Sequence, residues 1–212
     1  MAKVILDISI SLDGYVAGPD QSAEHPLGVG GDRLHDWAIR QASWREEHGR
    51  EGGERGIDDE VMAERTANVG ATIMGRGMFG GGPGPWPEEP WNGWWGEEPP
   101  FRTPVFVLTN HSREEVVMRG GTTFTFVTDG VESACAQAIE AAGGKDVVMA
   151  GGANAGRQFL DAGLLDEMRL HVVPILLGSG ARLLDGSDQS IELTIDRVVP
   201  SADVTHLYYR VG

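Results

Sequence analysis

The chain has 212 residues, the length of one ordinary α/β domain, and its 41% hydrophobic and 23% charged residues are typical of a globular protein. The formal net charge is −15 at pH 7. A surface this acidic repels phosphate backbones and argues against nucleic acid as a partner. The single cysteine, Cys135, excludes an intrachain disulfide and a zinc site built on cysteines.

Nothing in the sequence points to a membrane or a metal. No apolar stretch approaches the roughly 20 residues that a membrane span needs. Residues 1–7 carry a charge within their apolar run and are too short for a signal peptide. The histidines lack the spacing of known metal motifs. We therefore expect a cytoplasmic protein with no membrane partner and no metal ion.

The first half of the chain is predicted to alternate strands and helices. Apolar and small polar residues alternate in the first segment, and apolar residues then recur at helical spacing from Leu34 to Trp44. Asp32 also suits the N-cap of that helix. The expected elements are a strand at 4–10, a turn at 11–14, a loop at 18–31, helices at 32–47 and 58–67, and a strand at 71–74.

Residues 80–101 form the least regular segment of the sequence. They contain six prolines, six glycines and the tryptophans Trp86, Trp91, Trp94 and Trp95. A long segment without predicted helix or strand is usually functional or disordered, and four tryptophans argue against disorder. The rings either pack this loop onto the domain or form the wall of a pocket for a flat heterocycle.

The second half continues the alternation and ends in strands only. Asp129 and Glu132 are spaced as a capping box for a helix. The expected elements are strands at 105–109 and 123–128, a helix from about 130 to 142, a strand at 146–150, a helix ending at 161, and strands at 167–173, 191–199 and 204–211. This order predicts an α/β fold with a mostly parallel central sheet, antiparallel C-terminal strands and flanking helices.

Three glycine-rich turns follow predicted strands and are candidates for ligand contact. Gly75, Arg76 and Gly77 follow the third strand, where backbone N–H groups and a guanidinium suit a phosphate. Gly151 and Gly152 lead into a helix and suit either phosphate approach or close helix–strand packing. The third turn, residues 174–180, holds a glycine-flanked serine and suits either ligand contact or a tight turn. None of them completes a dinucleotide fingerprint.

Five motifs occur in an order that resembles the dihydrofolate-reductase-like superfamily. More specifically, the chain resembles the reductase domain of the riboflavin-biosynthesis deaminase/reductase and its free-standing relatives. The resemblance covers nearly all of residues 1–212, as a single domain with a three-layer fold. It rests on Ser11-Leu12-Asp13-Gly14-Tyr15-Val16-Ala17, Met74-Gly75-Arg76, Val107-Leu108-Thr109-Asn110, Gly151-Gly152-Ala153 and the stretch from Pro174 to Gly180.

The resemblance implies an oxidoreductase that binds NADPH across the C-terminal edge of the sheet. Arg76, Thr109 and Asn110 would hold the 2′-phosphate and adenine side. The implied pyrophosphate contacts are Gly75, Gly77, Met78, Gly151, Gly152, Ala153 and Asn154; the implied nicotinamide contacts are Ser9, Val16 and Ala17. The substrate side would be formed by Leu177, Gly178, Ser179 and Gly180, with Trp86 from the loop. Relatives also imply a homodimer, to which strand residues 207–210 are expected to contribute.

The sequence departs from the family pattern in two places. Dihydrofolate reductases have Thr where this chain has Met78. Their catalytic carboxylate begins the first long helix, where this chain offers both Asp32 and Asp36. We expect no zinc-dependent deaminase half within these 212 residues, because one cysteine cannot supply its P-C-x-x-C motif.

The expected activity is NADPH-dependent reduction of a planar heterocycle, of the 5-amino-6-(5-phosphoribosylamino)uracil reductase type. An acid or a bound water would supply the proton. The alternatives are a dihydrofolate or pterin reductase and, in another class, a nucleotide- or flavin-binding protein without turnover.

Overall fold

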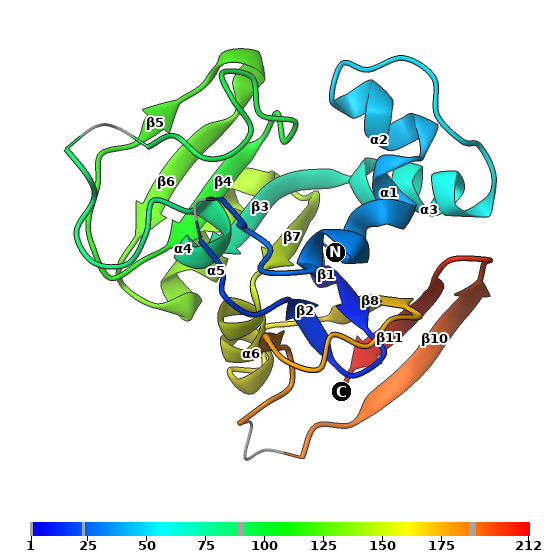
Figure 1. Cartoon of the computed structure of the whole chain (residues 1–212). Coiled ribbons are helices and arrows are strands. Elements are labelled where there is room, and N and C mark those ends of the chain that lie inside the picture. The colour runs from blue at the N-terminus through cyan, green and yellow to red at the C-terminus, as the bar shows by residue number, and fades with distance from the viewer. Residues whose placement is uncertain (1, 23, 89–90, 187–189) are drawn as a thin grey trace.

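The computed structural model describes residues 2–22, 24–88, 91–186 and 190–212, and a large twisted sheet forms its centre (Figure 1). Within these residues the strands run in the order β10-β11-β8-β1-β7-β3-β4-β6-β5. Their bounds are β1 (Val4–Ser11), β3 (Val69–Gly75), β4 (Pro104–Leu108), β5 (Val116–Val117), β6 (Thr123–Val127), β7 (Asp146–Gly151), β8 (Glu167–Val173), β10 (Leu193–Pro200) and β11 (Thr205–Val211). The pairs from β8 to β6 are parallel, whereas β11, β10 and β5 are antiparallel to their neighbours. The predicted fold class is confirmed.

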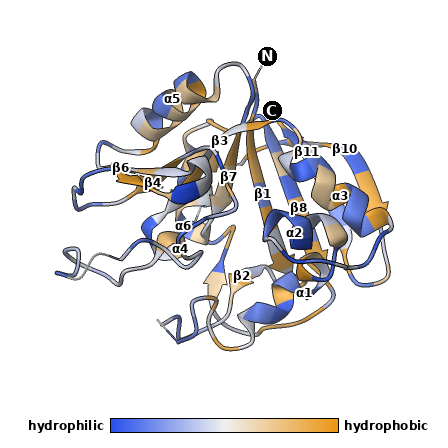
Figure 2. Cartoon of the chain, turned by 90° about the horizontal axis from the view of Figure 1, so that it is seen from above, coloured by the Kyte–Doolittle hydropathy of each residue, from blue (hydrophilic) through white to orange (hydrophobic). Residues whose placement is uncertain are grey.

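Helices cover both faces of the parallel part, which explains why every residue of β1 is buried. Figure 2 shows α5 on one side of the sheet and α1–α3 on the other. The helical segments are η1 (Gly31–His35), α1 (Asp36–Ile39), α2 (Ala42–Glu47), α3 (Ile57–Thr66), α4 (Arg76–Phe79), η2 (Arg119–Gly121), α5 (Val131–Ala142) and α6 (Ala153–Asp161).

Strand alternation divides β1 between two different environments. Leu6 and Ile8 point to the main core, which also holds Ala138 of α5 and Phe159 of α6. Asp7 and Ser9 point to the opposite face, where Trp37 of α1 lies over the sheet. One face of this strand is therefore purely apolar, and the other carries polar groups beneath α1 and α3.

The prediction of one continuous helix at 32–47 is wrong. A 3₁₀ turn, α1 and α2 replace it, and the break falls at Gln41, whose ψ of 145° is extended. Glu54 accounts for the break, because its carbonyl accepts the N–H of Ala42 at 2.9 Å and its N–H donates to the carbonyl of Arg40 at 2.8 Å. These bonds, together with the Gln41 amide on the Trp37 carbonyl at 2.6 Å, replace the missing helical ones.

Two predicted caps are also wrong. Asp32 does not cap the first helical segment, which follows Gly30 in a left-handed conformation. The helix α5 follows Gly130, whose φ is 95°, and no side chain caps its first turn. Asp129 instead accepts a hydrogen bond from the neighbouring Thr128 hydroxyl at 3.3 Å. A glycine with positive φ orients the chain at both positions, so the side-chain caps are not needed.

The short pair β2 (Tyr15–Ala17) and β9 (Ala181–Arg182) lies outside the large sheet and was not predicted. The C-terminal strands were predicted, but β11 does not lie at an edge. It pairs with β8 on one side and β10 on the other, so residues 207–210 are not free to pair with a second chain. In the described part of the chain, no helix is long and apolar enough to cross a bilayer.

Candidate active site

A cleft of about 1620 Å³ lies on the face of the sheet opposite α5. One side is formed by α1–α3. The other is formed by α4 with residues 80–101, the tryptophan-rich loop. Figure 1 shows these two groups on either side of β3. The carboxyl ends of β3, β4, β6 and β7 meet at its mouth. This is where ligands bind in open parallel sheets.

Arg76 supplies positive charge at the mouth. Its guanidinium stacks on the ring of Trp86 at 3.4 Å and lies 3.4 Å from the Thr109 hydroxyl. The Arg76 Nε atom is buried and has no hydrogen-bond partner within the described residues. Burial and the nearby Arg113 lower the pKa of Arg76. A guanidinium with an unused donor and no described carboxylate partner suits an anionic group.

The turn between β7 and α6 supplies backbone donors at the same edge. The first N–H groups of a helix have no partner within that helix and bind anions. A Cβ added to Gly152 would meet nothing within 4 Å, so its backbone is accessible from the cleft, which it lines with Ala153 and Asn154. Gly151 has a φ of 124° and does not line the cleft. A glycine is needed at position 151 because other residues rarely adopt this backbone conformation.

The motif at 11–17 has a structural role that explains its residue types. The Asp13 carboxylate accepts the backbone N–H groups of Leu177 and Gly178 at 3.1 and 2.7 Å, and the Ser11 hydroxyl at 2.6 Å. The Ser11 bond, followed by the two backbone bonds, lowers the pKa of Asp13 to about 2. Asp13 thus fixes the loop at 177–180 against β2, while Val16 and Ala17 line the cleft.

Most predicted cofactor contacts meet in the cleft. Its lining contains Ser9, Val16, Ala17, Gly75, Arg76, Gly77, Met78, Thr109, Asn110, Gly152, Ala153 and Asn154. The structure does not bring Asp32, Asp36, Trp86 or the loop from Leu177 through Gly178 and Ser179 to Gly180 to this lining. Asp32 and Asp36 are exposed, and Asp36 lines a separate hollow of about 220 Å³.

The described part of the tryptophan-rich loop contains no helix or strand, and residues 89–90 lie outside the description. Its tryptophan rings pack against α4, line the cleft, or do both. Trp91 and Trp94 donate to the carbonyls of Phe79 and Met78 at 2.8 and 3.0 Å. Trp94 and Trp95 line the cleft, whereas Trp86 and Trp91 do not. Trp91 therefore packs the loop onto α4, and Trp94 does so while also lining the cleft. Stacking of a flat heterocycle on these rings stays a prediction.

Polar residues at the inner end of the cleft were missed from the sequence. Asp7, His35 and Arg65 line this end. The Nε atom of Arg65 lies 2.6 Å from the Asp7 carboxylate, which is 2% exposed. Burial raises the pKa of Asp7, but Arg65 and His171 more than offset it, so this pKa lies well below its usual range. Burial, followed by Arg65, lowers the pKa of His35 to about 4, and His35 Nδ1 is buried without a described partner.

A family model named the RibD C-terminal domain matches residues 2–207. The chain belongs to this family. No curated protein matches the sequence. Among solved structures, a putative riboflavin biosynthesis protein from Shewanella sp. PV-4 is 23% identical with a TM-score of 0.65, and the match covers 99% of each chain.

Two further structures show how the fold is shared. A diaminohydroxyphosphoribosylaminopyrimidine deaminase/5-amino-6-(5-phosphoribosylamino)uracil reductase from Thermotoga maritima is 14% identical, with a TM-score of 0.56. This match covers all of the present chain but 57% of the Thermotoga chain. A dihydrofolate reductase from Enterococcus faecalis is 11% identical over 99% of this chain and 96% of its own, with a TM-score of 0.53. The fold of this RibD C-terminal domain is thus dihydrofolate-reductase-like.

Proposed function

We propose that this RibD C-terminal domain is an NADPH-dependent reductase of the 5-amino-6-(5-phosphoribosylamino)uracil type. The observation that carries the proposal is the convergence of Arg76 and the accessible N-terminus of α6 on one cleft. Family membership and the names of the Thermotoga and Enterococcus structures support a reductase. When bound, NADPH supplies the hydride.

The residues of the cleft fit a phosphorylated dinucleotide. The buried, unpaired Nε of Arg76 and the neighbouring Thr109 hydroxyl would hold the 2′-phosphate. The backbone at Gly152 and Ala153 would hold the pyrophosphate, because no side chain blocks it. Val16 and Ala17 offer an apolar wall for the nicotinamide. Met78 of α4 is half-buried and also lines the cleft. Together they bind and orient the cofactor and exclude water.

The test compares NADPH with NADH on wild type, Arg76→Ala and Arg113→Ala. A charge-assisted hydrogen bond contributes about 1.5–3 kcal/mol, so wild type is expected to prefer NADPH and Arg76→Ala to lose most of that preference. Arg113→Ala is a matched control, because Arg113 also lies over Trp86, at 5.1 Å, but does not line the cleft. Equal affinity of wild type for the two cofactors contradicts the proposal.

Turnover identifies the reaction. NADPH oxidation is followed with 5-amino-6-(5-phosphoribosylamino)uracil, with dihydrofolate as the competing substrate. We expect turnover with the pyrimidine. If dihydrofolate alone is turned over, the chain is a pterin reductase. If NADPH binds but neither substrate is turned over, the chain is a binding protein.

A further inference from the structure

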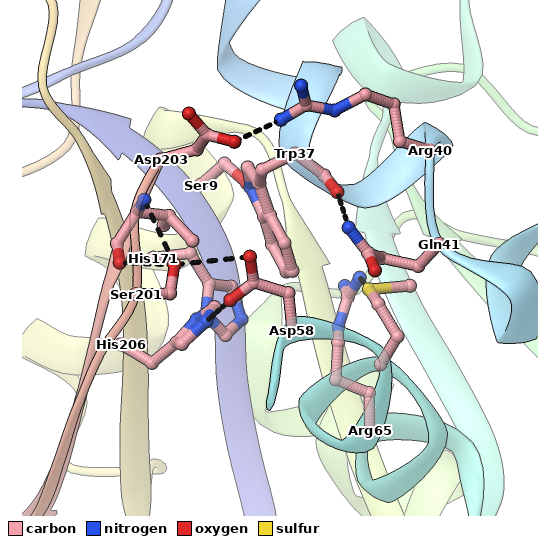
Figure 3. Close-up of polar contacts among 12 residues, drawn as sticks. Ser9, Trp37, Arg40, Gln41, Asp58, Arg65, His171, Ser201, Asp203 and His206 are labelled. Atoms are coloured by element: carbon pink, nitrogen blue, oxygen red, sulfur yellow. Dashed lines mark hydrogen bonds and ion pairs between the residues drawn. The ribbon is translucent and has the colours of Figure 1, made fainter. Parts of the chain in front are cut away.

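Two histidines join two carboxylates in a continuous hydrogen-bonded chain behind the cleft. Figure 3 labels three of its members, His171, His206 and Asp58. His171 Nε2 lies 3.1 Å from Asp7 Oδ1, and His171 Nδ1 lies 2.7 Å from His206 Nδ1. His206 Nε2 lies 3.0 Å from Asp58 Oδ1. The chain crosses from β1 through β8 and β11 to α3. It begins at a residue of the cleft wall and ends at a carboxylate whose side chain is 15% exposed.

The number of protons in this chain follows from its number of hydrogen bonds. Three N–H donors are needed for the three contacts, because an ionised carboxylate only accepts. Two neutral imidazoles supply two N–H groups. With two N–H groups for three contacts, one contact would join two acceptor atoms, although the atoms of all three contacts lie only 2.7–3.1 Å apart. A third proton removes this conflict and turns one imidazole into an imidazolium.

The surroundings place this proton on His171. Burial lowers the pKa of His206, the Asp58 hydrogen bond opposes this, and His171 lowers it further. His171 faces the fully buried Asp7, whose low pKa keeps it ionised. The ring of Trp37 packs against both imidazoles, with centroids 4.9 and 5.0 Å away, and keeps water from them.

The other charged groups around the chain fit this assignment. Arg65 of α3 and Arg169 of β8 act on Asp7, and Asp58 acts on His206. Ser201 donates to the second oxygen of Asp58 at 3.1 Å. The imidazolium of His171 therefore has a carboxylate on one side and a neutral imidazole on the other. A buried charge of this kind is tolerated because it is paired and fully hydrogen-bonded.

We propose that Asp7, His171, His206 and Asp58 hold one extra proton and deliver it to the cleft through Asp7. This role rests on the proposed function. Reduction of a C=N or C=O bond adds a hydride from the reduced nicotinamide to carbon. The π-electron pair moves to the heteroatom, which then takes one proton. Asp7 is the end of the chain that a ligand meets, and His171 is a positioning residue that acts through it.

The direction of transfer follows from the same contacts. Arg65 and His171 both contact Oδ1 of Asp7. A ligand in the cleft would meet the other oxygen, Oδ2. A heteroatom that gains electrons becomes far more basic than Asp7. Asp7 therefore takes the proton of His171 Nε2 on Oδ1, its carboxyl group turns about the Cβ–Cγ bond, and the proton passes to that heteroatom. His171 Nδ1 and His206 Nε2 keep their protons throughout, so His171 Nε2 regains its proton from the cleft side by the reverse route.

The first experiment locates the proton by ¹⁵N NMR of the histidine rings in wild-type protein near neutral pH. We expect both nitrogens of His171 to carry protons and one nitrogen of His206 to do so. Two neutral rings would overturn the proposal. This measurement needs no substrate, so its result is independent of whether the chain is a reductase.

The second experiment removes the extra proton without breaking the chain. In Asp58→Asn the amide donates to His206 Nε2, so three hydrogen bonds form with two neutral imidazoles. We expect unchanged melting and unchanged NADPH affinity, with kcat lowered about tenfold or more and a changed pH profile of kcat. Asp196→Asn, an exposed change of the same charge, is the matched control. A kcat and pH profile equal to those of the control would overturn the delivery role.

A third variant covers the case in which Asp58→Asn does not fold. His171→Gln keeps an N–H donor for Asp7 but cannot hold an extra proton. We expect NADPH affinity to stay at its wild-type value while kcat falls and its pH profile changes. Wild-type kcat in this variant would overturn the role. If wild type itself does not reduce the pyrimidine, the proposed function fails, and the NMR result still decides where the proton lies.

Discussion

Replacing Arg65 with Met is expected to leave Asp7 as a buried and poorly compensated carboxylate. The Arg65 side chain is 29% exposed and Asp7 is 2% exposed, with 2.6 Å between Nε and Oδ1. Breaking a buried ion pair costs about 3–5 kcal/mol, and the remaining His171 contact places the expected loss near the lower end. Arg119→Met is the control, because Arg119 and its partner Glu97 are both mostly exposed. Such a surface pair contributes at most about 1 kcal/mol.

The pH dependence of this loss has a defined sign. The folded-state pKa of Asp7 lies below its unfolded value, so the pairing contributes stability above about pH 4 and loses it as pH falls further. The difference between wild type and Arg65→Met is therefore expected to be full at neutral pH and to shrink in acid. Urea unfolding at several pH values measures it. A neutral-pH loss no greater than that of Arg119→Met refutes the reasoning.

Three further predictions concern the cleft and the sheet edge. Gly152→Val is expected to abolish NADPH binding, measured by titration, without lowering the melting temperature, because its side chain enters the cleft. Gly70→Ala is the contrasting variant. Its Cβ would lie 2.5 Å from the Ala142 carbonyl, so it is expected to lower the free energy of unfolding by about 1–3 kcal/mol. Trp94→Leu is expected to lower kcat/KM several-fold, because Trp94 lines the cleft. Trp91 lies outside the lining, so Trp91→Leu is expected to lower the melting temperature and to leave kcat/KM unchanged. A loss of kcat/KM in Trp91→Leu but not in Trp94→Leu would contradict these roles. A homodimer stays a prediction, and the exposed Ile195 and Val198 of the edge strand β10 are its expected contact. Sedimentation of Ile195→Asp should then show monomers, and an unchanged dimer would exclude this edge.

The strands and the phosphate side of the cleft could be predicted because their signals are local. An apolar run such as 105–109 is a strand wherever it lies in the sheet. Gly75 and Gly152 follow strands directly, so their place at the carboxyl edge follows from the parallel order. The break at Gln41 could not be predicted in this way, because it depends on Glu54, which comes from a distant loop.

The inner end of the cleft could not be predicted because its partners are far apart in sequence. His171 is buried. Its partners Asp7 and His206 are 164 and 35 residues away, and only strand register brings them together. One signal was available. Asp7 interrupts an otherwise apolar strand, and a charge at a buried position needs a partner.

The indole bonds of Trp91 and Trp94 have a consequence for engineering. They satisfy carbonyls at the end of α4, a helix of four residues that cannot satisfy them itself. The same short helix begins with Arg76. A shortened loop, or a loop grafted from another domain of this family, would therefore change the support under Arg76 as well as the wall facing the substrate. Cofactor preference and substrate range are thus expected to change together when this loop is redesigned.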